Sequence, residues 1–284
     1  MKKVLLLLLG FLLLPACGQT APEPAAQPPR RVVCLYASYA DLWLKAGGTL
    51  VGVTDDAISE RALPVGGAKS VGTLLRPNLE SIAALDPDLV IATPDIAAQL
   101  ALKENLARLG VATAYDTADT FAQYTRLAER FLALTGRSDL REPLIDAPTA
   151  QVEAVRAQTR GKAQPTVLLL RANSSGVNVK SEGTIAGEIL RDLGAVNLAD
   201  KTPSLLETLS LEVIAQENPQ FILVAPQGIT EADAQIVIRE LKAQNPVWGQ
   251  LEGRWVVLQK ELFHYKPNER WGEAYETLAN LIYA

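Results

Sequence analysis

The sequence contains very few of the residue types that most often bind metals or form covalent links. Its 284 residues include one histidine, His264, two cysteines, Cys17 and Cys34, and one methionine at the first position. A single histidine excludes histidine-rich metal sites and chemistry by histidine pairs. Two cysteines do not form a disulfide framework if Cys17 is modified. Cys34 lies in an apolar stretch that predicts a strand, so we expect a buried, inert thiol.

Positive charge is also scarce. The chain has 27 lysine and arginine residues against 32 aspartate and glutamate residues, for a net charge of −5. Removing the first sixteen residues takes away Lys2 and Lys3, which leaves 25 basic against 32 acidic residues and a net charge of −7. The sequence therefore lacks the basic footprint of a protein that binds nucleic acid.

The N-terminus has the pattern of an export signal. Two lysines precede the apolar run 4–14, which is too short for a permanent membrane-spanning helix. The run ends in the letters LPAC, which resemble a bacterial lipobox. This resemblance implies that residues 1–16 are a lipoprotein signal peptide and that Cys17 carries a thioether-linked diacylglycerol. Residues 17–29 are rich in proline and alanine, which predicts a flexible linker after the lipidated cysteine, and the alternative is an uncleaved anchor with an incidental cysteine.

Enzyme signatures are missing as well. We find no GxSxG nucleophile elbow, no HExxH or CxxC motif and no glycine-rich phosphate loop. A Ser-His-Asp triad would have to use His264, and no nucleophile elbow accompanies it. We therefore expect a protein without catalytic residues or a catalytic cofactor. A lipid-anchored α/β hydrolase and a lipoprotein that only scaffolds other proteins are the alternatives from other classes.

The chain does contain a repeated stretch. Residues 79–94 (LESIAALDPDLVIATP) return as residues 211–226 (LEVIAQENPQFILVAP), 132 residues later, with six of sixteen positions identical. Each copy predicts a short helix that stops near a proline, because the residue before a proline is pushed out of the α region. The apolar run after it predicts a strand covered on both faces. A period this long excludes a solenoid and indicates two similar lobes.

Strands and helices alternate at short spacing along the chain, which predicts an α/β fold with parallel-type sheets. We assign residues 30–137 to an N-terminal lobe and residues 162–284 to a C-terminal lobe. Residues 138–161 predict a connecting helix with an irregular start, because Pro143 and Pro148 lie in it. The alternative is a surface helix of one continuous domain. The predicted strands are 32–35, 50–53, 89–92, 111–115, 166–170, 221–224 and 254–258, and the predicted helices include 38–46, 79–85, 97–109, 120–135, 184–193, 211–217, 232–243 and 272–283.

Several stretches taken together resemble a known family. They are residues 31–35 with 48–53, 77–80 with 87–91, 211–212 with 218–219, Trp248, 256–258 and 267–275. Over residues 30–284 the chain is similar to the substrate-binding lipoproteins of ABC importers for cobalamin, haem and ferric siderophores. The resemblance implies two Rossmann-like lobes joined by a single long α-helix, the architecture of class III periplasmic binding proteins. It also implies a lipid-anchored location at the extracytoplasmic face of the cell membrane, in a periplasm or at the cell surface.

The same resemblance implies a transporter partner and two docking residues. In this family the glutamate of each Asn-Leu-Glu-like motif lies exposed on top of its lobe and pairs with arginines of the membrane subunits, and the matching positions are Glu80 and Glu212. Two equivalent carboxylates on similar lobes suit a permease dimer, which works with its ATPase and presents two equivalent faces. The alternative is that both are first-turn acids favoured by the helix dipole.

In two-lobed α/β proteins a ligand binds between the lobes, at the carboxyl ends of the strands. The loops expected there are 36–41, 74–77, 94–97, 171–180, 226–229 and 260–271. Their cations and aromatic residues suit an iron chelate, either a ferric siderophore or haem. Cobalamin is the alternative, weakened because Leu74 stands where cobalamin-binding relatives tend to place a tryptophan. The candidate ligand-binding residues are Tyr36, Tyr39, Arg76, Arg171, Lys180, Lys260, His264, Tyr265, Lys266 and Arg270.

His264 has two interpretations. On a late loop facing the expected cleft, its imidazole is a candidate axial ligand of haem iron or of the cobalt of cobalamin. The alternative is a hydrogen-bonded loop residue without any metal contact. The single helical connector also predicts that the lobes close only modestly around the ligand.

Overall fold

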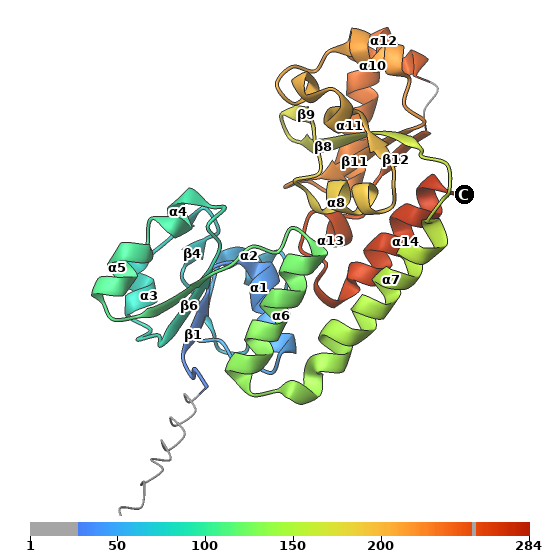
Figure 1. The fold of residues 1–284 in the computed structure, drawn as a ribbon. Coiled ribbons are helices and arrows are strands. Elements are labelled where there is room, and N and C mark those ends of the chain that lie inside the picture. The colour runs from blue at the N-terminus through green and yellow to red at the C-terminus, as the bar shows by residue number, and fades with distance from the viewer. Residues whose placement is uncertain (1–27, 252–253) are drawn as a thin grey trace, which may run out of the picture.

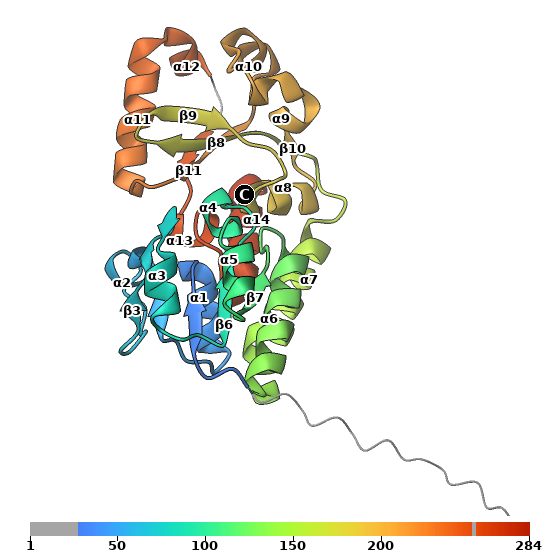
Figure 2. The ribbon, with the colours of Figure 1, turned by 90° about the vertical axis from the view of Figure 1, so that its left-hand side faces the viewer.

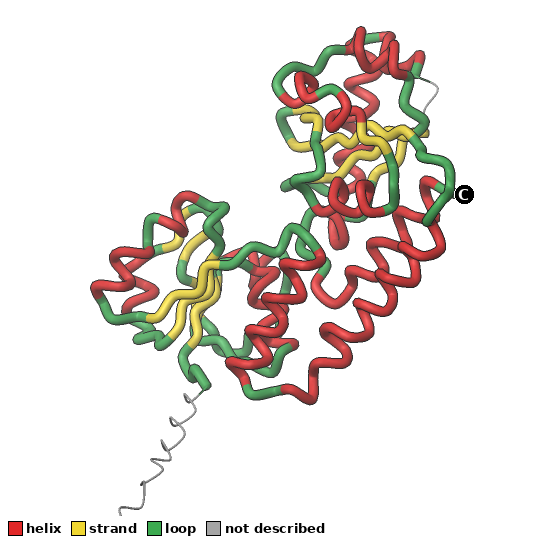
Figure 3. Tube along the Cα trace, in the orientation of Figure 1, coloured by secondary structure: helices red, strands yellow, loops and turns green. Residues whose placement is uncertain are grey.

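The structure is a computed structural model that describes residues 28–251 and 254–284. The predicted signal peptide at 1–16, Cys17 and most of the linker at 17–29 lie outside the described residues. Two groups of strands, each flanked by helices, form two α/β lobes (Figure 1, Figure 3). The α/β class predicted from the sequence is therefore confirmed.

The first lobe has a parallel sheet in the order β3-β2-β1-β6-β7, and β4 and β5 form a separate antiparallel pair. Its elements are β1 (Val32–Cys34), α1 (Ala37–Lys45), β2 (Gly52–Val53), α2 (Asp55–Ser59), β3 (Lys69–Ser70), β4 (Gly72–Thr73), β5 (Arg76–Pro77), α3 (Leu79–Ala83), β6 (Leu89–Ala92), α4 (Ala97–Leu100), α5 (Lys103–Arg108), β7 (Ala112–Tyr115) and α6 (Phe121–Thr135). The helix predicted over 97–109 is thus two helices. The buried Gln99 amide donates to the carbonyl oxygens of Leu35 at 2.7 Å and Leu74 at 3.2 Å, which fixes α4 at the edge of the sheet.

The second lobe has a parallel sheet in the order β10-β8-β11-β12, with β9 antiparallel to β8. Its elements are β8 (Thr166–Asn173), β9 (Gly176–Val179), α8 (Ile185–Asp192), β10 (Val196–Asn197), α9 (Leu198–Lys201), η3 (Pro203–Leu206), α10 (Leu211–Glu217), β11 (Phe221–Pro226), α11 (Glu231–Gln244), α12 (Pro246–Gln250), β12 (Arg254–Val257), α13 (Lys260–Phe263), η4 (Asn268–Arg270) and α14 (Trp271–Ile282). The loop predicted over 171–180 is instead mostly strand, because β8 runs on to Asn173 and the chain folds back as β9.

The repeat found in the sequence occupies the same place in both sheets. Its copies form α3 followed by β6 and α10 followed by β11, and the strand orders β2-β1-β6-β7 and β10-β8-β11-β12 correspond one to one. Asp86 and Asn218, which precede the prolines of the two copies, both have left-handed backbone, with φ of 44° and 38°. Aspartate and asparagine tolerate this conformation better than most residues, and it ends each helix.

A helical segment connects the two lobes. It begins as a 3-10 turn, η1 (Ser138–Leu140), continues as a π-turn, η2 (Glu142–Asp146), and becomes the α-helix α7 (Ala147–Thr159). Pro148 has no N–H with which to bond the carbonyl of Leu144, and the buried Tyr124 hydroxyl donates to that carbonyl instead. The prolines therefore produce the irregular start that the sequence predicts.

Each sheet packs on two apolar clusters, since successive side chains of a strand point to opposite faces. Val32 and Cys34 of β1 face α1 and α6, whereas Val33 and Leu35 face α3 and α5. The cluster on the inner faces is continuous from the first lobe through α7 to α8 and α14 of the second. Burial in this cluster raises the pKa of the Cys34 thiol to about 12, in agreement with an inert cysteine.

The segment between β12 and α14 forms hydrogen bonds with the first lobe and so makes a second connection between the lobes. Asn268 is 1% exposed, and its amide nitrogen donates to the Ser38 carbonyl at 2.9 Å and to Asp41 Oδ2 at 2.8 Å. The backbone N–H of Lys266 donates to Ser38 Oγ at 3.2 Å. In Figures 1 and 2, α14 then runs beside α7 in the same direction, so two parallel helices form the back of the molecule.

Candidate ligand-binding cleft

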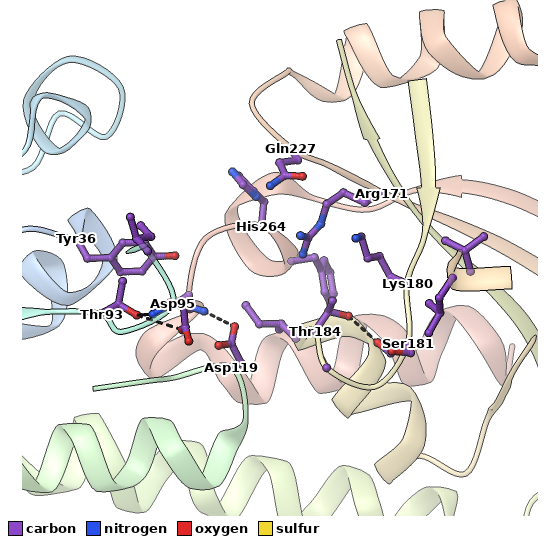
Figure 4. Close-up of a pocket in the computed structure, with 17 residues that line it drawn as sticks. Tyr36, Thr93, Asp95, Asp119, Arg171, Lys180, Ser181, Thr184, Gln227 and His264 are labelled. Carbon is purple, nitrogen blue, oxygen red and sulfur yellow. Dashed lines mark hydrogen bonds and ion pairs between the residues drawn. The ribbon is translucent and has the colours of Figure 1, made fainter. Parts of the chain in front are cut away.

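A cavity of about 570 Å³ lies between the two lobes and is lined by residues from both (Figure 4). It lies at the carboxyl ends of the parallel strands, which is where ligands bind in open α/β sheets. This is the size and place of a site for a small molecule. Its polar lining residues are Tyr36, Thr93, Asp95, Asp119, Arg171, Lys180, Ser181, Thr184, Gln227, His264 and Lys266.

The first-lobe wall is acidic. Asp95 follows β6 and Asp119 follows β7, so both reach the cavity because their strands end at the same edge. The Thr93 hydroxyl donates to Asp95 Oδ2 at 3.1 Å and holds that loop in place. Tyr36, which follows β1, completes this wall with an aromatic ring.

The second-lobe wall is cationic. Arg171 lies on β8 opposite Asn178 of β9, and Lys180 directly follows β9. The Lys180 backbone is fixed on both sides, because its N–H donates to the Leu169 carbonyl at 2.8 Å and its carbonyl accepts from Asn197 Nδ2 at 2.7 Å. The β8–β9 hairpin therefore carries both cations to the cavity.

The cations of the cavity differ in their pairing. Lys266 is paired with Asp119 and lies over the Tyr36 ring, with its Nζ 5.8 Å from the ring centroid. Within residues 28–251 and 254–284, the side chains of Arg171 and Lys180 have no ion pair and no hydrogen bond. Burial lowers the pKa of Arg171, and burial followed by the charge of Arg171 lowers the pKa of Lys180. Two partly buried like charges thus face the cavity without a direct partner among the described residues, and the charge of Asp119 acts on Arg171 only at a distance.

His264 lies between Arg171 and Tyr36 in Figure 4. Burial, and then the charges of Arg171 and Lys260, lower the pKa of His264 to about 4. The imidazole is therefore neutral near pH 7 and adds hydrogen-bonding capacity to the cavity without adding charge.

A second cavity of about 430 Å³ adjoins the first and shares Tyr36 and His264 with it. Asp55, Asp56 and Glu60 line it, together with Tyr265 and the apolar loop of Leu74 and Leu75. The Tyr265 hydroxyl and Lys260 Nζ both bind Glu60 Oε1, the latter at 2.6 Å. Lys260 and Tyr265 therefore join the lobes at the rim of this cavity.

Four of the candidate ligand residues line neither interlobe cavity, and one of them is Lys260, which is paired with Glu60. Tyr39 is fully buried in α1 and donates its hydroxyl to the Asp116 carbonyl at 3.0 Å, so it lies in the core rather than at the cleft. Arg76 is exposed on β5 and lines neither interlobe cavity. Arg270 lines neither, because its guanidinium forms two hydrogen bonds with the Glu273 carboxylate at 2.7 and 2.8 Å.

The loops expected after β6 and β11 do reach the cavity, but the residues that line it there, Asp95 and Gln227, are not among the candidates predicted from the sequence. Asp119, Ser181 and Thr184 were also missed. A search for polar residues immediately after every predicted strand, rather than for cations and aromatics, would have found Asp95 and Gln227.

Glu80 and Glu212 are exposed in the first turns of α3 and α10. The two helices have equivalent caps, since Asn78 Oδ1 accepts from the Ser81 N–H at 2.8 Å and Ser210 Oγ accepts from the Val213 N–H at 3.4 Å. Neither glutamate lines the interlobe cavities. The two carboxylates therefore occupy equivalent, outward-facing positions on the two lobes.

No helix within 28–251 and 254–284 has the length and apolar character that a membrane span requires. In the same residues, no group of three or more histidine, cysteine, aspartate or glutamate side chains is arranged to hold a metal ion.

Comparisons with known proteins agree on one family. Residues 32–253 match the model of the family described as periplasmic binding protein. The chain is 26% identical over 239 residues to the Fe(3+)-citrate-binding protein YfmC of Bacillus subtilis, covering 79% of this chain and 70% of that protein. It is 26% identical over 229 residues to the Fe(3+) dicitrate-binding periplasmic protein FecB of Escherichia coli, covering 78% and 73%. An ABC transporter substrate-binding protein from Listeria monocytogenes has a similar fold, with a TM-score of 0.72, 21% identity and coverage of 90% and 99%.

Proposed function

The chain belongs to the periplasmic binding protein family, and on that premise we propose that it captures an iron chelate between its lobes and delivers it to an ABC importer. The family suggested by the sequence resemblance is thereby confirmed. Its members bind solutes, so the alternative of a lipid-anchored hydrolase is set aside.

The interlobe cavity, with two cations that have no direct partner among the described residues, is the observation that carries this proposal. Arg171 and Lys180 face a space of about 570 Å³ at the carboxyl ends of the strands. Ferric chelates of this size are commonly anionic, and cations without partners are suited to bind them. The names of the relatives YfmC and FecB, which refer to ferric citrate, favour iron chelates over cobalamin.

The proposed mechanism is capture without chemistry. The chelate enters the cavity, the lobes tilt by a small angle, and the loaded protein binds the permease dimer. Two structural links support a small tilt, since α7 connects the lobes at the back and Asn268 binds Ser38 and Asp41 across them.

We further propose that Glu80 and Glu212 dock the protein on its permease, whose ATPase drives release. Both carboxylates are exposed, and their equivalent positions suit a partner with two equivalent faces. Charge pairs at such a surface tune association and register more than affinity. Neither residue touches the cleft, which leaves ligand binding independent of docking.

The sequence around Cys17 supports a lipid anchor at the extracytoplasmic face of the membrane. A diacylglycerol on that cysteine, followed by the linker up to residue 29, would hold the two lobes near the permease. Mass spectrometry of the protein from membranes tests this proposal, because a lipidated N-terminus at Cys17 supports it and an unmodified Cys17 overturns it.

Ligand titration tests the binding function directly. Ferric citrate, a neutral ferric trihydroxamate, haem and cyanocobalamin are added in turn to the purified two-lobed protein, and intrinsic fluorescence is recorded. Saturable binding of one iron chelate with a micromolar or lower Kd is expected. The proposal is wrong if none of the iron compounds binds.

A further inference from the structure

Arg171 and Lys180 differ from the other cations of the cleft in having no partner in the part of the chain that the structure describes. Lys266 is paired with Asp119, and Lys260 is paired with Glu60. Across the described residues, 28–251 and 254–284, Arg171 and Lys180 form no salt bridge. Both are partly buried on the β8–β9 hairpin and line the same cavity.

This arrangement is costly in the empty protein. Two like charges close together repel each other, and partial burial removes some of the water that would screen them. Folding nevertheless holds them there, since the backbone of Lys180 is fixed by Leu169 and Asn197. A bound anion would relieve both the repulsion and the desolvation.

The geometry also selects the kind of anion. An arginine guanidinium presents a planar fork of donors that matches a carboxylate, whereas a lysine ammonium acts as a point charge. In Figure 4 both groups point from the second lobe into one part of the cavity, beside Ser181, whose hydroxyl can donate a further hydrogen bond. The Thr184 hydroxyl donates to the Ser181 carbonyl at 3.1 Å and holds this segment in place. The opposite wall carries Asp95 and Asp119 and would repel an anion.

We propose that Arg171 and Lys180 form an anion subsite that binds free carboxylates of a ferric hydroxycarboxylate chelate, with the charged side of the chelate turned to the second lobe. This inference rests on the proposed function and names the ligand class of the same site. The preferred cargo is then neither a neutral hydroxamate chelate nor cobalamin, which present no free carboxylate, nor haem, which presents only two propionates at one edge of an apolar macrocycle.

The test uses the full two-lobed protein and ferric citrate as the probe, measured by isothermal titration calorimetry at low salt. Arg171→Gln and Lys180→Gln should each weaken ferric citrate binding at least tenfold, and raising the NaCl concentration from 50 to 500 mM should weaken the wild type severalfold. Arg76→Gln is the matched control, since that arginine is exposed outside both cavities and its removal should leave the Kd unchanged.

A second readout separates this role from a structural one. Removing an unpartnered charge leaves no bonded group behind, so Arg171→Gln should keep or raise the melting temperature of the empty protein. A fall of several degrees would assign Arg171 a structural role and overturn the inference.

The binding results also distinguish failure of the carboxylate subsite from failure of the proposed iron-chelate binding. Preferred binding of haem or a neutral trihydroxamate, or an unchanged ferric citrate Kd in Arg171→Gln, would overturn the carboxylate subsite and leave iron-chelate capture intact. Failure of all the iron compounds to bind would overturn both.

Discussion

The two lobes have the same order of strands, but the cleft walls that they form carry opposite charges. The strand orders β2-β1-β6-β7 and β10-β8-β11-β12 correspond. The helix–strand repeat supplies the third strand of each order, β6 after α3 and β11 after α10. At the cleft, however, the first lobe presents Asp95 and Asp119, and the second presents Arg171 and Lys180. The lobes are therefore similar in their sheets and different in the segments that leave the carboxyl ends of the strands.

The difference has a simple structural origin. In the first lobe, β1 ends at Cys34, and the chain enters α1 three residues later. In the second lobe, the equivalent strand β8 runs on to Asn173 and pairs with β9. This extra hairpin carries Arg171 and Lys180 to the cavity. The equivalent sheets therefore suit a partner with two equivalent faces, whereas the differently charged cleft walls suit a ligand that is charged on one side.

The largest effect is expected from reversing the charge of the two proposed docking residues, one on each lobe. We predict that Glu80→Arg combined with Glu212→Arg abolishes uptake of the chelate in cells, because cationic side chains at the proposed docking positions would repel the arginines expected on the permease. The single variants should each lose part of the uptake, and to a similar extent. The affinity for the chelate, measured on the purified protein, should not change.

The control for this experiment places the same charge change elsewhere. Glu104→Arg with Glu240→Arg alters one exposed helical glutamate in each lobe, and uptake should stay near the wild-type level. Docking through Glu80 and Glu212 would be refuted if both double variants lost uptake equally, or if the first lost ligand binding.

The next largest effect is expected from removing the hydrogen bonds that Asn268 forms between the lobes. Asn268 has φ of 53° and donates to the Ser38 carbonyl and to Asp41 Oδ2. We predict that Asn268→Gly, which keeps the backbone conformation accessible, lowers the free energy of unfolding by about 2 to 4 kcal/mol, since one lost hydrogen bond involves a carboxylate. Urea unfolding followed by tryptophan fluorescence measures this change.

Asn218→Gly is the matched control for Asn268→Gly. Asn218 also has left-handed backbone, with φ of 38°, but it is exposed at the end of α10. Its replacement should change the unfolding free energy by less than about 0.5 kcal/mol. Equal losses in the two variants would show that backbone conformation, rather than the contact between lobes, determines the effect.

These comparisons also show what the sequence can predict. The repeat at 79–94 and 211–226 predicts the two equivalent sheets, because apolar runs and helix stops depend on neighbouring residues. Tyr39 was misplaced because a strand followed by a helix start does not reveal which helical face meets the core. Only the folded chain brings the Tyr39 hydroxyl to the Asp116 carbonyl, 77 residues away.

The cleft was predictable in position but not in detail. The loops after β6 and β11 were expected at the ligand, since parallel strands end at one edge. Residues 171–180 were expected there too, but as a loop, because their polar character does not reveal the hairpin of β8 and β9. Pairing is also invisible in the sequence: Lys266 and Lys180 were both candidate ligand residues, yet only Lys266 meets an aspartate among the described residues.

His264 provides a smaller, pH-dependent test of the second-lobe wall. Its pKa in the folded protein is about 4, below the usual 6.5, so between these values the unfolded chain binds a proton that the folded chain does not. Stability is therefore lost as the pH falls from 6.5 to 4, by about 2 kcal/mol through this group after allowance for solvent screening. His264→Gln should reduce the loss between pH 7 and pH 4.5, and an identical pH dependence in both proteins would contradict this account.

The smallest effect is expected from removing a negative charge from the acidic wall of the cleft. Asp95 is exposed on the first-lobe side of the cavity and accepts a hydrogen bond from the Thr93 hydroxyl, which an asparagine can also accept. We predict that Asp95→Asn raises the affinity for ferric citrate about twofold, because it removes one screened negative charge from a cavity that receives an anion. Glu104→Gln, outside the cleft, is the control and should have no effect. A tenfold loss of affinity in Asp95→Asn would instead mean that the carboxylate accepts hydrogen bonds from the ligand, so that both walls, rather than the second alone, select the cargo.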